Sequence, residues 1–250
     1  MTSDAHNNRL IAVTGASRGI GAGIAVELAR RGFRVACLTR SGAGPQTEAA
    51  AALRARFVSQ ACDVDDEASV RNALRAVAEN GRLDGLVNNA GIHLDGPSHE
   101  LDTATYERVM RTNATSVFTM SREAYPYLVA AGRSTIVNIG SFFDKIGVKR
   151  NLAYCASKAA VGAMTRCLAV EWAAKGIRVL DVAPGYVVTD LNRQSLESGP
   201  VREYIDKRIP GRRPGTVDEI ARLVACIFAE DIPFLTGETI YIDGGQGIAH

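Results

Sequence analysis

The chain has 250 residues, 46% of them hydrophobic, which is enough to bury the core of one large α/β domain. Its formal charge of +2, from 29 basic and 27 acidic residues without a long basic run, argues against nucleic acid as a partner. No segment approaches the ~18 consecutive apolar residues that a membrane span requires, and the polar start MTSDAHNNRL lacks the features of a signal peptide. The five cysteines form no Cys-x-x-Cys pair, so we expect no disulfide framework, no zinc site and a cytoplasmic location.

Predicted strands and helices alternate along the chain. Strands are predicted at residues 10–14, 33–39, 57–62, 83–88, 135–139, 177–182 and 239–242. Helices are predicted at residues 21–31, 46–54, 66–79, 102–112, 114–131, 153–175 and 216–229, the last with a capping box from Thr216 to Glu219. Apolar strands that alternate with helices favour a parallel sheet covered on both faces. We therefore predict an α/β fold, a single domain over residues 1–250 with a doubly wound parallel seven-stranded sheet and helices on both faces.

Residues 185–215 show no clear periodicity but contain several glycines and prolines. Two interpretations are open: a mobile lid beside the substrate, or a pair of short helices with a weak pattern. We assign the segment to the substrate side of the site as a lid.

A glycine-rich loop, Thr-Gly-Ala-Ser-Arg-Gly-Ile-Gly at residues 14–21, joins the first predicted strand to the first helix. Three glycines permit a tight turn and a close backbone approach to a pyrophosphate, and the helix N-terminus offers free N–H groups with a partial positive charge. A plain turn is the alternative, but a loop at the first strand–helix junction favours a Rossmann-type dinucleotide site. The predicted cofactor contacts of this loop are Gly15, Ser17, Arg18, Gly19, Ile20 and Gly21.

The GxxxGxG spacing of this loop is followed by further motifs. They are Asn-Asn-Ala-Gly at residues 88–91, Asn113 in a predicted helix, Ser141 after a strand, Tyr154 with Lys158, and Pro184-Gly185 followed by Thr189. In this order, and over nearly the whole chain, they resemble the short-chain dehydrogenase/reductase family. The loop TGASRGIG, the stretch VAPGYVVTD and the closing LTGETIYIDGG are similar to those of the family's 3-oxoacyl-acyl-carrier-protein reductases.

The end of the second predicted strand indicates which nicotinamide cofactor binds, because it meets the adenosine ribose in a dinucleotide fold. An acid there would favour NAD, but this chain has Ala-Cys-Leu-Thr-Arg-Ser at residues 36–41. Thr39 and Arg40 suit a 2′-phosphate, and Arg18 can reach the same group from the glycine loop. Solvated arginines are the alternative, yet NADP-preferring members of the resembled family commonly carry arginine at both places. We predict NADP(H) as the cofactor.

The resemblance implies the remaining contacts with the cofactor. Asp63 and the backbone of Val64 would bind the adenine. The alternative is that Asp63 caps the next helix, a role that Asp65 or Asp66 could fill instead. The chain would pass the adenine-side ribose at Asn89, Ala90 and Gly91. The carboxamide of the nicotinamide would be framed by Pro184, Gly185, Val187 and Thr189.

Tyr154 and Lys158 occupy positions i and i+4 of a predicted helix and therefore share one helix face. A nearby ammonium lowers the pKa of a phenol, so we predict Tyr154 as the general acid/base and Lys158 as the cation that assists it and reaches the nicotinamide ribose. Ser141 follows the fifth strand, where a hydroxyl can polarise a substrate carbonyl. The resemblance adds Asn113, whose backbone carbonyl would hold a water beside the lysine. A Tyr-x-x-x-Lys pair alone is more often solvated, but the other motifs favour catalysis.

The sequence says less about the substrate and the assembly. Phe142, Phe143 and Tyr186 suggest an apolar wall beside the reacting carbon, although either phenylalanine could face the core. His93 could touch cofactor or substrate, or be an ordinary loop histidine. We expect a small ketone or secondary alcohol as the substrate, of the 3-oxoacyl type or another, and no nucleic-acid or membrane partner. The resemblance also implies a homotetramer.

Other functions remain open at this point. One is a non-catalytic NADP(H)-binding sensor or scaffold, which would not need the Ser, Tyr and Lys set. Another is a sugar or polyol dehydrogenase of the same family. A third is a sugar-nucleotide epimerase or dehydratase, which would need a longer C-terminal domain than the roughly 60 residues that follow Thr189.

Overall fold

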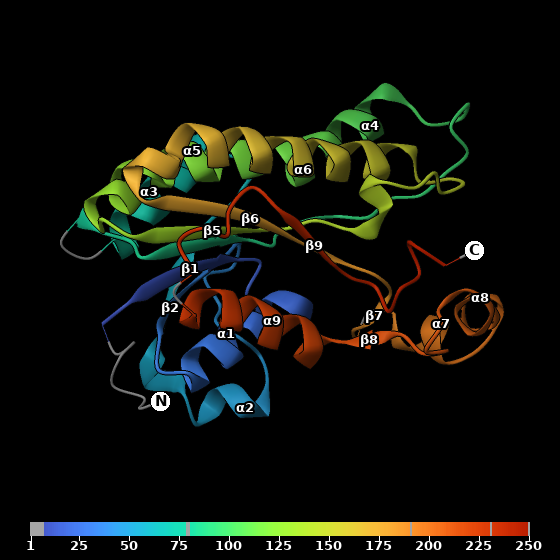
Figure 1. The fold of residues 1–250 in the computed structure, drawn as a ribbon, viewed down its shortest axis with the longest axis horizontal. Helices are drawn as coiled ribbons and strands as arrows, with labels where there is room; N and C mark the ends of the chain where they lie inside the picture. Colours follow the sequence, from blue (N-terminus) through green and yellow to red (C-terminus); the bar gives the residue numbers. More distant parts are fainter. Residues whose placement is uncertain (1–7, 79–80, 191, 231, 250) are drawn as a thin grey trace.

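Seven strands form one parallel sheet in the computed structural model, which describes residues 8–78, 81–190, 192–230 and 232–249 (Figure 1). The strands are β1 (Leu10–Thr14), β2 (Arg34–Thr39), β3 (Phe57–Ala61), β4 (Gly85–Asn88), β5 (Ser134–Ile139), β6 (Ile177–Pro184) and β9 (Thr239–Ile242). Their order is β3-β2-β1-β4-β5-β6-β9, and every neighbouring pair is parallel. The predicted doubly wound α/β fold is confirmed. Its winding reverses between β1 and β4, where a ligand crevice forms beyond the carboxyl ends of the strands.

Helices cover both faces of this sheet. The longer ones are α1 (Gly19–Arg30), α3 (Glu67–Val77), α5 (Ser116–Ala130), α6 (Leu152–Trp172) and α9 (Val217–Ala229), and the shorter ones are α2 (Glu48–Ala51), α4 (Thr103–Met110), α7 (Arg193–Glu197) and α8 (Pro200–Arg208). In Figure 1, α1 and α9 lie on one face, and α3, α5 and α6 lie on the other. The predicted capping box of α9 is confirmed: Thr216 Oγ1 accepts from the Glu219 N–H, and the Glu219 carboxylate accepts from the Thr216 N–H at 2.8 Å.

Each face of the sheet has its own apolar core. In β1, Ile11 and Val13 belong to the core on the side of α1 and α9. Leu10 and Ala12 belong to the core on the side of α3 and α5. This alternation follows from the two-residue repeat of a strand. Because the central strands β1, β2, β4, β5 and β6 are buried on both sides, they are rich in apolar residues, and their carboxyl ends are held in fixed positions.

The segment at residues 46–54 is less helical than predicted. Only α2 forms, and a 3-10 turn follows at Arg54–Arg56. Ala50 is the one buried residue of α2, so the segment lacks the apolar face that stabilises a longer helix. For the helix predicted at residues 66–79, the structure describes α3 as ending at Val77, and Glu79 lies outside the described residues.

The two helices predicted at residues 102–112 and 114–131 are joined without a break. A π-helical turn at Arg111–Thr115 connects α4 to α5. Thr112, Asn113 and Ala114 are buried in this turn. A single π-turn inside a helix often occurs at a functional site, and here it holds Asn113 in the interior.

Residues 185–215 contain two short helices, α7 and α8, as one of the two interpretations predicted. Two short strands, β7 (Val187–Val188) and β8 (Gly215–Thr216), pair in parallel and connect this segment to the rest of the chain. A small core of Leu196, Ile205 and Ile209 lies inside the segment, and Tyr186 and Val188 pack against it.

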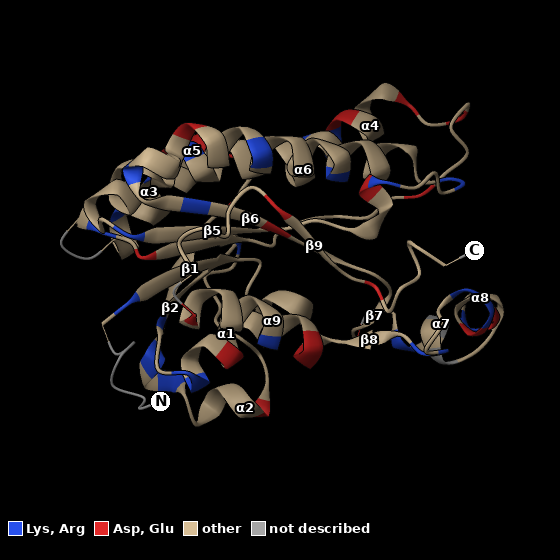
Figure 2. Cartoon of the chain, in the orientation of Figure 1, with Lys and Arg blue, Asp and Glu red and all other residues tan. Residues whose placement is uncertain are grey.

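Charged residues of both signs are spread over the helices and loops (Figure 2). The strands at the centre carry few of them. Within the residues that the structure describes, no helix combines the length and the apolar character needed to cross a membrane.

Candidate active site

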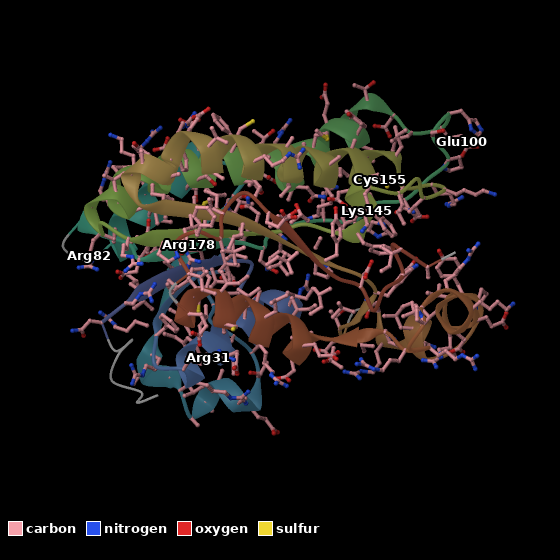
Figure 3. All side chains as sticks on the ribbon, in the orientation of Figure 1. Arg31, Arg82, Glu100, Lys145, Cys155 and Arg178 are labelled. Carbon is pink, nitrogen blue, oxygen red and sulfur yellow. The ribbon has the colours of Figure 1, made fainter. Side chains whose placement is uncertain are left out.

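The predicted site residues gather where the strands end. All strands of the main sheet are parallel, so the loops after β1, β4, β5 and β6 meet at one edge. Figure 3 shows Lys145 and Cys155, which neighbour the predicted catalytic residues in the sequence, toward one end of the molecule. Arg82 and Arg178, which lie near the beginnings of β4 and β6, are toward the other end.

The glycine loop after β1 is compact and requires its glycines. Gly15 and Gly19 have φ angles of +66° and +56°, in the left-handed region that favours glycine. A Cβ atom at Gly21 would lie 2.3 Å from the Gly15 carbonyl oxygen, so no larger residue fits there. Gly15 is held to β2 by its N–H, which donates to the Leu38 carbonyl at 2.8 Å. A ligand at the start of α1 can therefore approach the backbone of this loop closely.

The N-terminus of α1 is available to an anion. Its N-cap residue, Arg18, makes no side-chain capping hydrogen bond, and the first turn contains no acidic residue. The N–H groups and the helix dipole there suit a phosphate. Ser17 accepts a hydrogen bond from the Gln46 N–H through its carbonyl at 3.0 Å, and Ile20 packs against the core. These residues fit a dinucleotide pyrophosphate.

A pocket of about 450 Å³ adjoins this helix start. Gly19, Gly23, Val188 and Thr189 are among the residues that line it. The pocket brings the glycine loop together with the segment after β6. Gly19 and Thr189, one from each, are 170 residues apart in the sequence.

The Asn-Asn-Ala-Gly motif docks onto the glycine loop. Thr14 Oγ1 accepts from the N–H groups of Asn89 and Ala90 at 2.9 and 3.0 Å. Asn89 Nδ2 donates to the Thr14 carbonyl at 2.9 Å. Gly91 lies against Asn113, because a Cβ at this glycine would be 3.2 Å from Asn113 Oδ1. The Asn-Asn-Ala-Gly motif thus connects the glycine loop to the π-helical turn that holds Asn113.

The residues predicted to choose between NADP and NAD lie at the end of β2. The side chains of Arg18 and Arg40 are both exposed. Thr39 is buried, and its hydroxyl donates to the Ala43 carbonyl at 2.9 Å. The Thr39 hydroxyl therefore shapes the turn after β2. Arg40 follows it directly in the sequence, and Arg18 lies at the N-cap of α1.

Asp63 is not the helix cap after β3. Asp66 is the N-cap of α3 and accepts a hydrogen bond from the Ala68 N–H. The carboxylate of Asp63 is exposed and accepts from the Asp65 N–H at 3.1 Å, and Val64 packs against the core. The cap was one of the two roles considered for Asp63, and the structure gives it to Asp66.

The predicted nicotinamide frame is organised by a residue that the sequence did not suggest. Asn192 Oδ1 accepts from the Thr189 N–H at 2.7 Å, and Asn192 Nδ2 donates to the Val187 carbonyl at 2.9 Å. Pro184 ends β6, and Gly185 follows it directly. Asparagine side chains commonly stabilise turns in this way, but nothing in the spacing marked this one.

Ser141, Tyr154 and Lys158 come together from two elements. Ser141 follows β5, and its hydroxyl oxygen caps the 3-10 turn Phe142–Asp144 by accepting from the Phe143 N–H at 3.3 Å. The Ser141 hydroxyl is also hydrogen-bonded to the Tyr154 phenol of α6. Lys158 Nζ lies 5.7 Å from the centre of the Tyr154 ring.

Burial moves the pKa values of both groups on α6. It raises the pKa of Tyr154 to about 12, against the hydrogen bond from Ser141, which lowers it. It lowers the pKa of Lys158 to about 8, against the attraction of the Asp181 carboxylate, which raises it. Lys158 Nζ donates to the Ile139 carbonyl at 2.8 Å. The ammonium is thus buried and oriented on the helix face of the phenol, and the phenol holds its proton at neutral pH. The lowered pKa predicted for Tyr154 from the nearby lysine is wrong, because desolvation of the phenol dominates and Ser141, not Lys158, is the neighbour that lowers the pKa.

Asn113 is linked to the same turn of α6. Its Nδ2 donates to Ser157 Oγ at 3.1 Å, and the Ser157 hydroxyl donates to the Tyr154 carbonyl at 2.7 Å. The four predicted catalytic residues therefore lie in one connected region of the structure.

An aromatic cluster lines the space beside Tyr154. The ring centres of Phe142 and Phe143 lie 5.6 and 6.3 Å from that of Tyr186, and Phe143 lies 5.8 Å from Tyr154. Both phenylalanines are buried, so each packs in the interior and also contributes to the predicted apolar wall beside Tyr154. His93, treated above as open, lies edge-on to Tyr154 with 4.8 Å between ring centres. The spacing of residues in the sequence could not predict this contact between His93 and Tyr154.

A second, smaller pocket of about 130 Å³ lies at the opposite edge of the sheet. Arg9 and Arg178 line it, but both guanidinium groups bind the end of α9: Arg9 Nη1 donates to the Phe228 carbonyl and Arg178 Nη2 to the Ile227 carbonyl, each at 3.0 Å. Arginines commonly stabilise helix C-termini in this way. The predicted catalytic residues Ser141, Tyr154 and Lys158 are at the other edge, where the carboxyl ends of the strands lie.

Comparison with known proteins agrees with this geometry. The family described as enoyl-(acyl carrier protein) reductase matches residues 15–246. The chain is 35% identical to D-threitol dehydrogenase of Mycolicibacterium smegmatis, covering 97% of this chain and 94% of that protein. It is also 35% identical to the 3-oxoacyl-acyl-carrier-protein reductase of Escherichia coli, covering 95% and 97%. A crystal structure from Agrobacterium tumefaciens with bound NADP is similar at a TM-score of 0.86 and 31% identity, covering 96% of each chain.

A parallel doubly wound sheet, a glycine loop and a Ser–Tyr–Lys group at one edge define a dinucleotide-dependent oxidoreductase of alcohols and ketones. The chain belongs to the short-chain dehydrogenase/reductase family, as its motifs predicted, and its sequence is close to those of the carrier-protein ketoreductases.

Proposed function

We propose that this protein is an NADPH-dependent ketone reductase that also works in reverse as a secondary-alcohol dehydrogenase. The observation that supports this most is the grouping of the Ser141 hydroxyl, the Tyr154 phenol and the buried Lys158 ammonium at the carboxyl ends of the strands. A sensor that only bound the cofactor would not need this set.

Each residue of the group has a defined task in the proposed reduction. NADPH, when bound, supplies the hydride. Ser141 donates a hydrogen bond to the substrate oxygen and polarises the carbonyl. Tyr154 donates its proton to the same oxygen as negative charge develops there. Lys158 stabilises the phenolate that remains, since a neighbouring cation favours the charged form of a phenol.

We assign the cofactor as NADP(H) rather than NAD(H). The chain has no acid at the end of β2, Arg40 follows that strand directly, and the side chains of Arg40 and of Arg18 in the glycine loop are both exposed. An acid at this place would accept hydrogen bonds from a free ribose and repel a 2′-phosphate, whereas arginine binds phosphate. A structural relative with bound NADP supports the assignment.

The substrate is proposed to be a small ketone or 3-oxoacyl compound. Phe142, Phe143 and Tyr186 offer an apolar surface next to Tyr154, which suits an acyl chain or a compact ketone better than a fully hydroxylated sugar. The relative from Escherichia coli is named for 3-oxoacyl substrates, and the relative from Mycolicibacterium smegmatis is named for a polyol. Residues 185–215 would act as the lid on this side, because Tyr186 packs against their small core.

A homotetramer is proposed as the working assembly. Phe118 on α5 and Val170 on α6 are apolar side chains on the face of the sheet that α3, α5 and α6 cover. Their exposed fractions are 45% and 83%. Such positions suit contact with a second copy, and closed symmetry is common among oligomers of this kind. Sedimentation equilibrium measures the mass directly, and a monomer at micromolar concentration would contradict the proposal.

The test of the catalytic proposal is Tyr154→Phe, which removes one hydroxyl. Loss of NADPH absorbance is followed with a panel of β-ketoesters, diketones and ketoses. We expect turnover to fall by roughly 10²–10⁴-fold, while NADPH still binds, as measured by its fluorescence. Tyr127→Phe, on α5, is the matched control and should leave turnover unchanged. Near-normal rates in the Tyr154 variant would refute the assignment.

A further inference from the structure

A buried carboxylate lies within β6, behind the candidate active site. Asp181 is fully buried, and among the described residues its Oδ1 has no hydrogen-bond partner. Its Oδ2 accepts a hydrogen bond from the Thr239 hydroxyl of β9 at 3.3 Å. A carboxylate buried with so few partners is costly unless an opposite charge compensates it.

The side chain of Asp181 faces the helix that carries the catalytic pair. Its neighbours Leu180 and Val182 belong to the core on the side of α1 and α9. Val179 belongs to the core on the opposite side. Because side chains alternate along a strand, Asp181 points to the same side as Val179, which α6 covers. Lys158 is on that helix.

The backbone just before Ser141 contacts both charged groups. Lys158 Nζ donates to the Ile139 carbonyl at 2.8 Å. Asp181 lies so close to Gly140 that a Cβ there would be 2.5 and 2.6 Å from the two carboxylate oxygens. The glycine before the catalytic serine is therefore what leaves room for the carboxylate.

Lys158 and Asp181 stabilise each other's charged form. Burial lowers the pKa of Lys158 to about 8, and among the described residues Asp181 is the charged group that opposes this fall. Burial raises the pKa of Asp181 to about 6, and Lys158 opposes that rise. Each group therefore favours the charged form of the other, and removal of the Asp181 carboxylate would lower the pKa of Lys158 further.

Other titratable groups surround this pair. Tyr154 faces Lys158 from one turn earlier on α6. Asp144 acts on Asp181 by repulsion, and its carboxylate accepts from the Tyr241 hydroxyl of β9 at 2.9 Å. The remaining cations near Tyr241 are Lys145, whose Nζ lies 3.4 Å from the centre of its ring, and Arg166.

We propose that Asp181 is a positioning residue that keeps Lys158 cationic while the reaction runs. It does not touch the substrate; it acts through the ammonium, which in turn supports the Tyr154 phenolate. Its kinetic consequence rests on the proposed function, whereas the electrostatic interaction between Asp181 and Lys158 can be measured without turnover.

The direct test is a titration of Lys158 by NMR. The chain has five lysines, so protein labelled with ¹³C at the lysine Cε gives few resonances, and Lys158→Arg identifies the one of interest. In Asp181→Asn we expect the Lys158 midpoint to fall by at least about one pH unit, a tenfold loss of proton affinity. Asp181→Val removes the same charge and serves if the asparagine variant does not fold. An unchanged midpoint overturns the inference, whatever the activity.

A matched control separates charge from general destabilisation. Asp84 is also a buried aspartate of this sheet, but it lies at the start of β4, where it accepts from the Leu10 N–H at 2.8 Å. Asp84→Asn should leave the Lys158 midpoint in place, and an equal shift in this variant would also overturn the inference.

The kinetic test uses the pH profile of alcohol oxidation. With Asp181→Asn, the loss of activity at high pH should begin at lower pH, by the same interval as the NMR shift. An NMR shift in an enzyme without ketone turnover would refute the proposed function and keep the charge pairing. A normal pH profile with a shifted midpoint would show that the charge of Lys158 does not support Tyr154, which refutes the positioning role.

Discussion

The side chain of Asn113 pairs with both backbone groups of Ile92, as a neighbouring strand would. Asn113 Nδ2 donates to the Ile92 carbonyl at 2.9 Å, and Asn113 Oδ1 accepts from the Ile92 N–H at 2.8 Å. Through Ser157, the same amide reaches the turn of α6 that carries Tyr154. One side chain in a π-helical turn therefore ties the segment after β4 to the catalytic helix.

Asn113→Ala should lower both stability and turnover. It leaves the partly buried Ile92 N–H and carbonyl without their side-chain partner, and a hydrogen bond of this kind contributes about 0.5–1.5 kcal/mol. The turn of α6 around Tyr154 also loses the hydrogen bond from Asn113 to Ser157. We therefore expect kcat to fall by roughly tenfold to a hundredfold. Urea unfolding and steady-state kinetics measure the two effects. Ser157→Ala keeps both bonds to Ile92, so it should lower kcat with a smaller loss of stability; normal kcat in both variants would contradict the tether.

Arg40→Asp should move the cofactor preference from NADPH toward NADH. The variant replaces a cation that suits the 2′-phosphate by an acid that suits a free ribose hydroxyl. A charged hydrogen bond contributes about 1.5–3 kcal/mol, so the ratio of kcat/KM for NADPH over NADH should fall by at least about tenfold. Arg54→Asp makes the same charge change at an exposed position in the 3-10 turn before β3. The same ratio in the Arg40 variant as in the unmodified protein would refute the phosphate contact.

Asp181 should make the protein less stable as the pH rises from about 4 to about 6. Burial raises its pKa from 3.8 to about 6, so in this range the folded chain binds a proton that the unfolded chain has released. The stabilising effect of the proton is complete below about pH 4 and is lost above about pH 6. A shift of about two units corresponds to about 3 kcal/mol.

Asp181→Asn removes that pH dependence. Relative to the unmodified protein, the free energy of unfolding of the variant should rise by about 2 kcal/mol between about pH 4.5 and about pH 7.5. Urea unfolding at the two pH values gives the comparison. A difference between the two proteins that stays constant across this range would contradict the raised pKa.

Thr216→Ala should destabilise the protein through α9. It removes the oxygen that accepts from the Glu219 N–H, and loss of such a cap costs about 1 kcal/mol, within a range of about 0.5–2. Thr216→Ser keeps the oxygen and should retain most of the stability. The urea midpoint reports both. Equal midpoints for the alanine variant and the unmodified protein would show that the Glu219 carboxylate alone is sufficient.

The strands were the most predictable part of the fold, because burial on both faces leaves apolar runs that no other element explains as well. β1 and β9 have the predicted bounds. The short helices of residues 185–215 were not placed in advance, since they are held by contacts within that segment rather than by a periodic apolar face. The uninterrupted path from α4 to α5 was missed because a π-turn has no sequence pattern of its own.

The candidate site was predictable as a set of residues but not as a set of contacts. Spacing placed Tyr154 and Lys158 on one helix face, as they are in the structure. It could not bring His93 to the Tyr154 ring, since that contact joins a loop after β4 to α6. Asp181 gave no signal either: one acid inside an apolar run does not reveal that Gly140 makes room for it and that Lys158 compensates its charge.

The small core of Leu196, Ile205 and Ile209 makes residues 185–215 an exchangeable cassette. Its side chains pack on one another and on Tyr186 and Val188, and a single pair of short strands, β7 and β8, anchors both ends of the insertion. Substitutions within α7 and α8 that keep this small core leave in place both cores of the sheet and the turn of Thr189 and Asn192, which belongs to the predicted nicotinamide frame. What enters beside Tyr154 can therefore vary without changes to the residues that move the proton.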